Sequence, residues 1–79
     1  MQKNDVFRAL RRRVGKAVRR HRAACCLTQE ELAVRASMGW RHVQKIEAGE
    51  VNVTLRTLSK LATALSTDPL ELLVAGSAD

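Results

Sequence analysis

The sequence predicts an all-α fold, a compact domain of five helices, on the basis of three observations. Apolar residues recur at three- and four-residue spacing along the chain, without the alternation typical of strands. Phe7 and Trp40 are the only aromatic residues, so leucine, valine, isoleucine and alanine must build the core. Residue types that cap helices precede several of the apolar runs. With 79 residues and no linker or internal repeat, residues 1–79 are expected to form one domain.

The first helix is predicted to run from about Asp5 to Cys25, because an apolar stripe continues along it at helical spacing. The stripe is formed by Phe7, Leu10, Val14, Ala17 and Val18. Gly15 interrupts the stripe, and its missing side chain would let a second helix approach closely. Residues 1–13 either lengthen this helix or form a basic arm, and the sequence does not decide between the two.

The second and third helices are expected on either side of a short turn. Thr28 and Glu31 have the spacing of a capping box, which would start a helix that reaches about Ala36. Gly39 is an acceptable N-cap for the next helix, which would cover residues 40–48 and end at the glycine that follows.

Two further helices are expected in the C-terminal third of the chain. Thr54 would cap the fourth helix. The inner side of that helix is expected to consist of Leu55, Leu58, Leu61, Ala62 and Leu65. Asp68 and Pro69 are residue types favoured at the start of a helix, so the fifth helix should begin there and end at Gly76.

Positive charge is concentrated at one end of the chain. Residues 1–22 contain nine Lys or Arg and one acid, Asp5, whereas the remaining residues contain five basic and seven acidic groups. A cationic end favours an anionic partner, nucleic acid first and a membrane surface second. In the membrane interpretation, residues 5–22 would bind the surface. An ordinary solvated helix face explains the Arg-rich stretch equally well. Because neither a secretory signal nor a membrane-spanning run is present, we expect a cytoplasmic protein that acts away from membranes.

Patterns for catalysis and metal binding are missing from the sequence. Cys25 and Cys26 are adjacent, and no other Cys or His stands at the spacing of a zinc site. We expect them to be reduced, partly buried and apolar in character, with a redox sensor as the lesser alternative. The sequence has neither a Gly-rich phosphate loop nor a nucleophile with a plausible base. No enzymatic activity, cofactor or metal is therefore expected.

The third helix would have a narrow apolar side and a wide polar side. At about 100° per residue, Val43 and Ile46 define the buried side. Arg41, Gln44 and Lys45 then fall on the opposite side. Arg and Lys can donate to guanine and Gln can pair with adenine, each good pair contributing about 1–3 kcal/mol of base discrimination. Taken alone, this pattern is more typical of an ordinary exposed helix, with a recognition helix in the DNA major groove as the alternative; the helix before it shifts the balance towards DNA.

Four segments at their expected separations resemble successive parts of the lambda repressor and Cro (XRE-type) helix-turn-helix family. They are VGKAVRRHR (14–22), LTQEELAVRASM (27–38), VQKIEAGE (43–50) and LRTLSKLATAL (55–65). The resemblance covers about residues 14–74. It implies a lambda-repressor-like domain that binds double-stranded DNA, with residues 28–48 as the helix-turn-helix.

The resemblance also implies roles for individual residues. Base edges would be read from the third helix by Trp40, Arg41 and Lys45, with Gln44 adjacent. Phosphate contacts are implied for Gln29 at the start of the second helix, for Arg22, and for Asn52 and Thr54 in the loop before the fourth helix. Thr28, Arg19 and His42 are further candidates for phosphate contacts, with an idle surface position as the alternative for His42. Arg22 and Glu47 are expected to form a structural ion pair.

Two positions depart from the family pattern. Cys26 stands in the first turn where a Gly is usual, and a left-handed backbone there would cost on the order of 1 kcal/mol. Trp40 stands where small polar residues are more common. Its ring would contact a thymine methyl, pack on sugar and phosphate, or fold back over the core.

Together these patterns favour a transcriptional regulator. One short helix reads few bases, so specific binding argues for a homodimer on a palindromic operator. The last two helices are expected to provide the dimer surface, with core packing as the alternative, through Leu70, Leu72, Leu73 and Val74. An antitoxin partnered by a toxin, or a restriction–modification controller protein, would have the same fold. A protein-interaction module that has lost DNA binding is a further interpretation.

Overall fold

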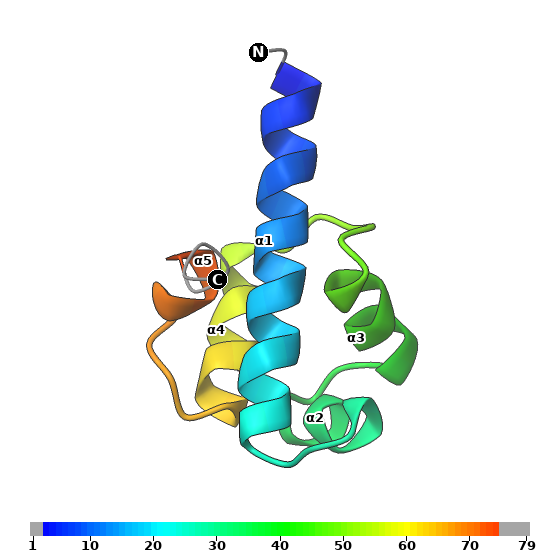
Figure 1. The fold of residues 1–79 in the computed structure, drawn as a ribbon. Helices are drawn as coiled ribbons and strands as arrows, with labels where there is room; N and C mark the ends of the chain where they lie inside the picture. The colour runs from blue at the N-terminus through cyan, green and yellow to red at the C-terminus, as the bar shows by residue number, and fades with distance from the viewer. Residues whose placement is uncertain (1–2, 75–79) are drawn as a thin grey trace.

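A computed structural model describes residues 3–74, with side chains from residue 5 to residue 73. Figure 1 shows five α-helices, and no strand occurs within the described range. The helices are α1 (Lys3–Ala24), α2 (Gln29–Arg35), α3 (Trp40–Glu47), α4 (Leu55–Ala64) and α5 (Glu71–Val74). The predicted all-α fold with five helices is thus confirmed. The predicted stop at Gly76 and the side chain of Val74 lie outside the described residues.

The core lies where the C-terminal half of α1 meets the other four helices. Its largest wholly buried side chains are Leu32, Ile46, Leu61, Leu72, Val18 and Val43. Val14 and Ala17 continue the buried side of α1, as the apolar stripe predicted. Leucine, valine, isoleucine and alanine make up this core, and neither of the two aromatic side chains belongs to it.

The N-terminal half of α1 projects beyond the other helices (Figure 1). A helix of 22 residues is about 33 Å long, close to the 36 Å of the longest molecular dimension. From residue 3 onward, the chain before residue 14 therefore lengthens the helix and does not form an arm. Phe7 and Leu10 remain 43% and 46% exposed on this segment. Both residues lie in the apolar stripe as expected, but no other helix covers this part of the stripe.

The turn between α1 and α2 is left-handed at Cys26, where φ is +58°. The Cys26 amide donates to the Ala23 carbonyl at 3.0 Å, and the Leu27 amide donates to the Arg22 carbonyl at 3.1 Å. This is the pattern of a Schellman motif, whose left-handed position favours glycine. The expectation that both cysteines are partly buried is wrong: Cys25 and Cys26 are exposed. They lie on the surface of the turn, and Leu27 is the residue that enters the core.

The capping box predicted for α2 is present. The Glu31 amide donates to Thr28 Oγ1 at 3.0 Å, and the Thr28 amide donates to Glu31 Oε1 at 2.8 Å. These hydrogen bonds hold the pKa of Glu31 below its ordinary value. A tight turn with Ser37 at positive φ leads to the N-cap, Gly39, of α3. The helix ends at Glu47 with Ala48 as its C-cap, and the Gly49 that follows has a φ of +73°.

Close approach of α1 and α3 depends on Gly15, as the sequence indicated. A Cβ atom added there would lie 2.5 Å from the Ile46 carbonyl oxygen and 2.8 Å from that of Glu47. These distances are too short for any side chain, so only glycine permits this packing. The close contact fixes the position of α3 against the middle of α1.

The C-terminal helices differ from the prediction in detail. Leu55 is 84% exposed at the first position of α4, so its expected place on the inner side is wrong. The Asp68 carboxylate accepts from the Leu70 amide at 2.8 Å, but α5 itself begins at Glu71. Leu72 is wholly buried in the core of the chain. Its proposed place on a dimer surface is therefore wrong, because the side chain is already covered.

Candidate nucleic-acid interface

The third helix presents its polar side to solvent. Val43 and Ile46 are buried and hold α3 on the core. On the opposite side, Arg41, Gln44 and Lys45 are exposed. The predicted division of this helix into a buried and an exposed side is thus what the structure shows. Three side chains able to donate to base edges are brought together on one surface.

A hydrogen-bonded group behind α3 joins three helices. Arg22 Nε donates to Glu47 Oε2 at 2.6 Å, and Nη2 donates to Oε1 at 3.0 Å. Arg22 Nη1 also donates to the Leu27 carbonyl at 2.8 Å. This bidentate pair confirms the predicted ion pair between Arg22 and Glu47. The hydrogen bond to Glu47 raises the pKa of Arg22, although partial burial opposes the rise.

The sequence did not predict that Gln29 belongs to this group. Its Nε2 donates to Glu47 Oε1 at 3.0 Å, so one carboxylate binds the end of α1 and the start of α2. Such a contact between residues 18 apart depends on how the helices meet, and a local pattern gives no sign of it. The group holds α2 and α3 in a fixed relation, which a groove-binding surface requires.

A hollow of about 410 Å³ lies in front of this group. Its lining combines residues from three helices, namely Arg19, Arg22, Gln29, Gln44, Glu47 and Ala48. A second hollow of about 340 Å³ shares Gln44 and Ala48 with the first and reaches Arg41 and Lys45. Arg19 of α1 thus lies on the same surface as the exposed side of α3.

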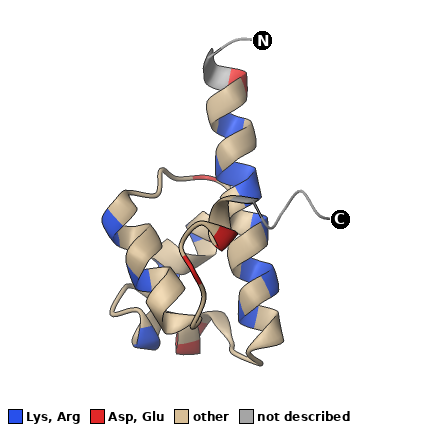
Figure 2. Ribbon diagram, turned by 90° about the vertical axis from the view of Figure 1, so that its left-hand side faces the viewer, with Lys and Arg blue, Asp and Glu red and all other residues tan. Residues whose placement is uncertain are grey.

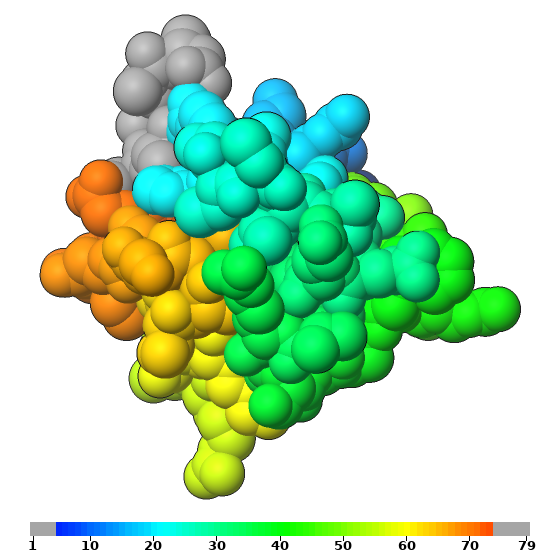
Figure 3. Space-filling model, turned by 90° about the horizontal axis from the view of Figure 1, so that it is seen from below, coloured from blue at the N-terminus to red at the C-terminus, as the bar shows by residue number. Residues whose placement is uncertain are grey.

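Figure 3 places this surface relative to the other helices. Seen from below, α2 and α3 occupy one side of the molecule and α4 and α5 the other. Figure 2, which views the molecule from the side of α4 and α5, shows Lys and Arg along α1 and also on α4. The two hollows that share Gln44 bring Arg19 of α1 and the cations of α3, Arg41 and Lys45, to one surface.

The remaining candidate residues surround α3 without forming one cluster. Thr28 and Thr54 act as N-caps of α2 and α4, so each hydroxyl is already engaged by the backbone. His42 and Asn52 are exposed. Trp40 is 44% exposed, so part of its ring is open to solvent at the start of α3.

No helix within residues 3–74 is long and apolar enough to cross a membrane. No group of three or more His, Cys, Asp or Glu side chains that could hold a metal ion occurs among the described residues.

The two short helices α2 and α3, joined by a tight turn and with a polar outer side on the second, define a helix-turn-helix domain. Comparison with protein families agrees, because the helix-turn-helix model matches residues 18–72. The chain belongs to the XRE-type helix-turn-helix family, the type that the lambda repressor resemblance implied. It is a DNA-binding transcriptional regulator.

Solved structures of regulators share the fold. The restriction-modification controller protein C.AhdI from Aeromonas hydrophila is 39% identical, with a TM-score of 0.79, over 81% of this chain and 97% of its own. Two structures of the clp gene regulator ClgR from Corynebacterium glutamicum are 26% and 29% identical, with TM-scores of 0.81 and 0.80. They cover 86% and 89% of this chain and 72% and 94% of their own. A search of curated protein sequences found no match.

Proposed function

We propose that this protein is a sequence-specific regulator that binds a palindromic operator as a homodimer, with α3 in the major groove. The observation that carries the proposal is the exposed row of Arg41, Gln44 and Lys45, held outward by the buried Val43 and Ile46. We further propose that the protein is not an enzyme. We place it in the cytoplasm, where its DNA partner would be.

Base reading would be performed by the exposed side of α3. Arg41 and Lys45 would donate to guanine O6 and N7, and Gln44 would pair with adenine. Trp40, half exposed at the first turn, would contact a thymine methyl or a sugar beside the groove. An N-terminal position on the recognition helix places such side chains nearest the base edges.

Phosphates would be contacted around this row. Arg19 lies beside Gln44 on the larger hollow, and Arg22 and Gln29 line the same hollow. These side chains contribute affinity without base preference. Further phosphate contacts are proposed from the capping and loop positions, Thr28, His42, Asn52 and Thr54.

A homodimer would double the number of bases read. A single short helix covers one half-site, and half-sites of two-fold operators lie about one helical turn, roughly 34 Å, apart. Of the residues expected at the dimer surface, Leu70, directly before α5, is exposed, and Leu73 of α5 is half-buried. These two remain available to a second subunit, whereas Leu72 does not.

A restriction–modification controller is the second candidate. The similarity to C.AhdI favours it, since 39% identity extends over 97% of that protein. In this case the gene should lie beside genes for a restriction endonuclease and a DNA methyltransferase. An antitoxin gene would instead stand beside a gene for its toxin partner, so the neighbouring genes separate these possibilities. A protein-interaction module would bind no duplex.

Selection of bound duplexes from a random pool tests the proposal. We expect enrichment of a site with two-fold symmetry. On that site, Arg41→Ala and Lys45→Ala should each weaken binding by about 1–3 kcal/mol and relax base preference. Arg19→Ala should weaken binding to all sequences about equally. If Arg41→Ala and Lys45→Ala leave affinity and preference unchanged, α3 does not read the bases.

A further inference from the structure

The apolar stripe of α1 continues past the end of the core. Val14, Ala17 and Val18 are buried beneath the other helices, whereas Phe7 and Leu10 occupy the same stripe one to three turns earlier and are exposed. Val6 is also exposed on this projecting segment. A helix in a monomer normally bears polar residues where nothing covers it, so an apolar stripe at this place indicates a missing partner.

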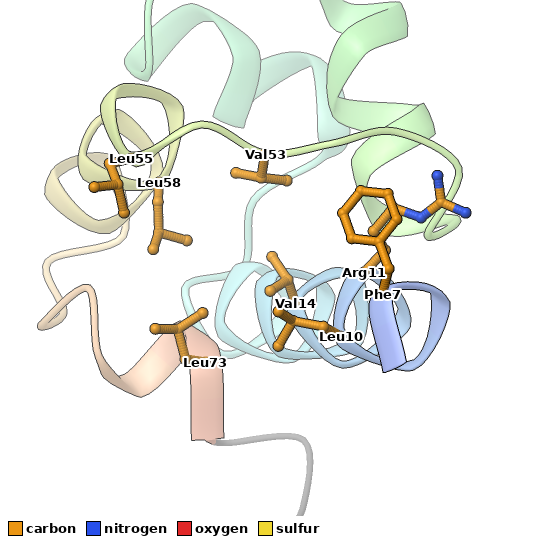
Figure 4. Close-up of a pocket in the computed structure, with 8 residues that line it drawn as sticks. All are labelled: Phe7, Leu10, Arg11, Val14, Val53, Leu55, Leu58 and Leu73. Atoms are coloured by element: carbon orange, nitrogen blue, oxygen red, sulfur yellow. The ribbon is translucent and has the colours of Figure 1, made fainter. Parts of the chain in front are cut away.

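A groove lies beside this stripe, where the projecting segment of α1 leaves the core (Figure 4). Its volume is about 190 Å³, more than the roughly 150 Å³ of a cavity that binds benzene. Leucine and valine side chains from α1, α4, α5 and the loop before α4 line it, together with Phe7 and Arg11. No residue of α3 belongs to this lining, so occupation of the groove would leave the base-reading row free.

Arg11 adds a polar requirement at the edge of the groove. Its guanidinium carbon lies 4.8 Å from the centre of the Phe7 ring, which holds the side chain in place. Its Nε atom is shielded from water and has no hydrogen-bond partner among the described residues. Because the Arg11 guanidinium places a positive charge beside the apolar lining, the fitting partner brings an acidic group as well as apolar side chains.

We propose that a second copy of this chain covers the stripe, by antiparallel packing of the two projecting α1 segments about a two-fold axis. This inference rests on the homodimer of the proposed function and names its interface. Phe7 of one helix would lie against Leu10 of the other, and each segment would cover the groove of its partner. A two-fold axis makes such a surface complementary to itself.

Each projecting segment has a net positive charge, so the charges favour the antiparallel orientation over the parallel one. Asp5 is the only acid in residues 1–22. In the antiparallel pair with Phe7 against Leu10, Asp5 of one copy comes alongside Arg12 of the other and next to Arg11. Its carboxylate can then accept from the guanidinium of Arg11 or of Arg12. A parallel pair would instead place Arg11 of one chain beside Arg11 of the other, and these like charges repel.

The interface lies outside the part of the chain that matches the family. That match begins at residue 18, whereas the projecting apolar residues lie between residues 6 and 10. The proposed dimer contact is accordingly a property of this chain's long first helix and not of the shared helix-turn-helix.

Sedimentation equilibrium of the full chain tests the proposal. The double variant Phe7→Ala/Leu10→Ala should raise the dimer dissociation constant by about 100-fold, because each chain loses two central anchors. Val34→Ala is the matched control, since Val34 is 80% exposed but lies on α2; it should leave the constant unchanged. Circular dichroism of each variant reports whether the helices remain folded.

A charge pair sharpens the test of orientation. Asp5→Lys should weaken the dimer by about 10-fold, whereas Glu30→Lys on α2 should not change it. Leu70→Ala, directly before α5, probes the alternative interface at the C-terminal helix. If Leu70→Ala dissociates the dimer and the Phe7/Leu10 variant does not, the interface lies at α5; this overturns the inference and leaves the homodimer standing.

A wild-type chain that stays monomeric up to about 100 μM overturns the inference and the free dimer together. Base reading by α3 is measured separately on the selected duplex, so failure of the interface and failure of DNA binding are distinguished.

Discussion

The two halves of α1 carry the same apolar periodicity but have different surroundings. From Val14 onward the helix packs on the core, meets α3 at Gly15 and pairs with Glu47 through Arg22. Before Val14 the stripe is uncovered and flanked by arginines. The difference teaches that periodicity identifies the side of a helix suited to contact, whereas the contact itself depends on what the rest of the fold places there. We therefore expect the C-terminal half to determine stability and the N-terminal half to determine assembly.

The largest effect is expected when the hydrogen-bonded group that joins the C-terminal half of α1 to α2 and α3 is broken. Glu47→Ala leaves Arg22 and Gln29 without their shared acceptor and should cost about 3 kcal/mol of unfolding free energy. Urea denaturation measures it. Arg8→Ala, on the projecting half, is the control and should change stability by less than about 0.5 kcal/mol. Equal losses for the two variants would contradict the contrast between the halves.

A smaller loss is expected from Gly15→Ala. The added Cβ would overlap the carbonyl oxygens of Ile46 and Glu47, and the helices would have to separate, at a cost of about 2 kcal/mol. Thermal unfolding at a single pH measures this. Gly39→Ser adds a Cβ where no atom lies within 4 Å. It should be neutral or slightly stabilising, because serine is a good N-cap. A harmless Gly15→Ala would show that α1 and α3 do not depend on this contact.

In the turn that ends α1, a substitution is expected to increase stability, in contrast to the two losses above. Cys26→Gly should raise stability by about 1 kcal/mol, because the left-handed backbone strains any residue with a Cβ. Cys25→Gly, one residue earlier where φ is not positive, should lower stability instead. Chemical denaturation of both variants gives the two signs, and a stabilising Cys25→Gly would refute the assignment of strain to residue 26.

The smallest expected effect is on how stability depends on pH in acidic solution. The pKa of Glu31 is lowered by its hydrogen bonds with Thr28, so its contribution to stability is present above the ordinary value of 4.5. That contribution is lost as the pH falls below 4.5 through the lowered value. Unfolding midpoints between pH 5 and pH 2 (about the range in which carboxylates titrate) should depend less on pH in Glu31→Gln. An unaltered pH profile would show that the capping box carries no titrating contribution.

Local patterns predicted the helices well because their ends are determined by neighbouring residues. The capping box at Thr28, the cap at Thr54 and the stop at Gly49 each act within four residues. The exposed row on α3 followed from periodicity, and the Arg22–Glu47 pair followed from the family resemblance. The left-handed strain foreseen for Cys26 is present.

Features that depend on tertiary packing were missed. The hydrogen bond from Gln29 to Glu47 needs α2 and α3 to meet at one angle. Leu55 was expected on the inner side of its helix and is exposed, whereas Leu72 was expected at a surface and is buried. Helical spacing predicts which way a side chain points from its helix, but it does not predict whether another element covers that side. The exposure of Cys25 has the same cause, since the chain turns away from the core there.

Trp40 gives the molecule a built-in optical reporter. It is the single tryptophan of a chain without tyrosine, so ultraviolet-excited emission comes almost wholly from one indole. That indole stands half open to water at the first turn of α3, and its emission should therefore shift to shorter wavelength when a duplex displaces the water. Titration of unlabelled protein would then follow occupancy at the helix itself, without a dye attached to either molecule.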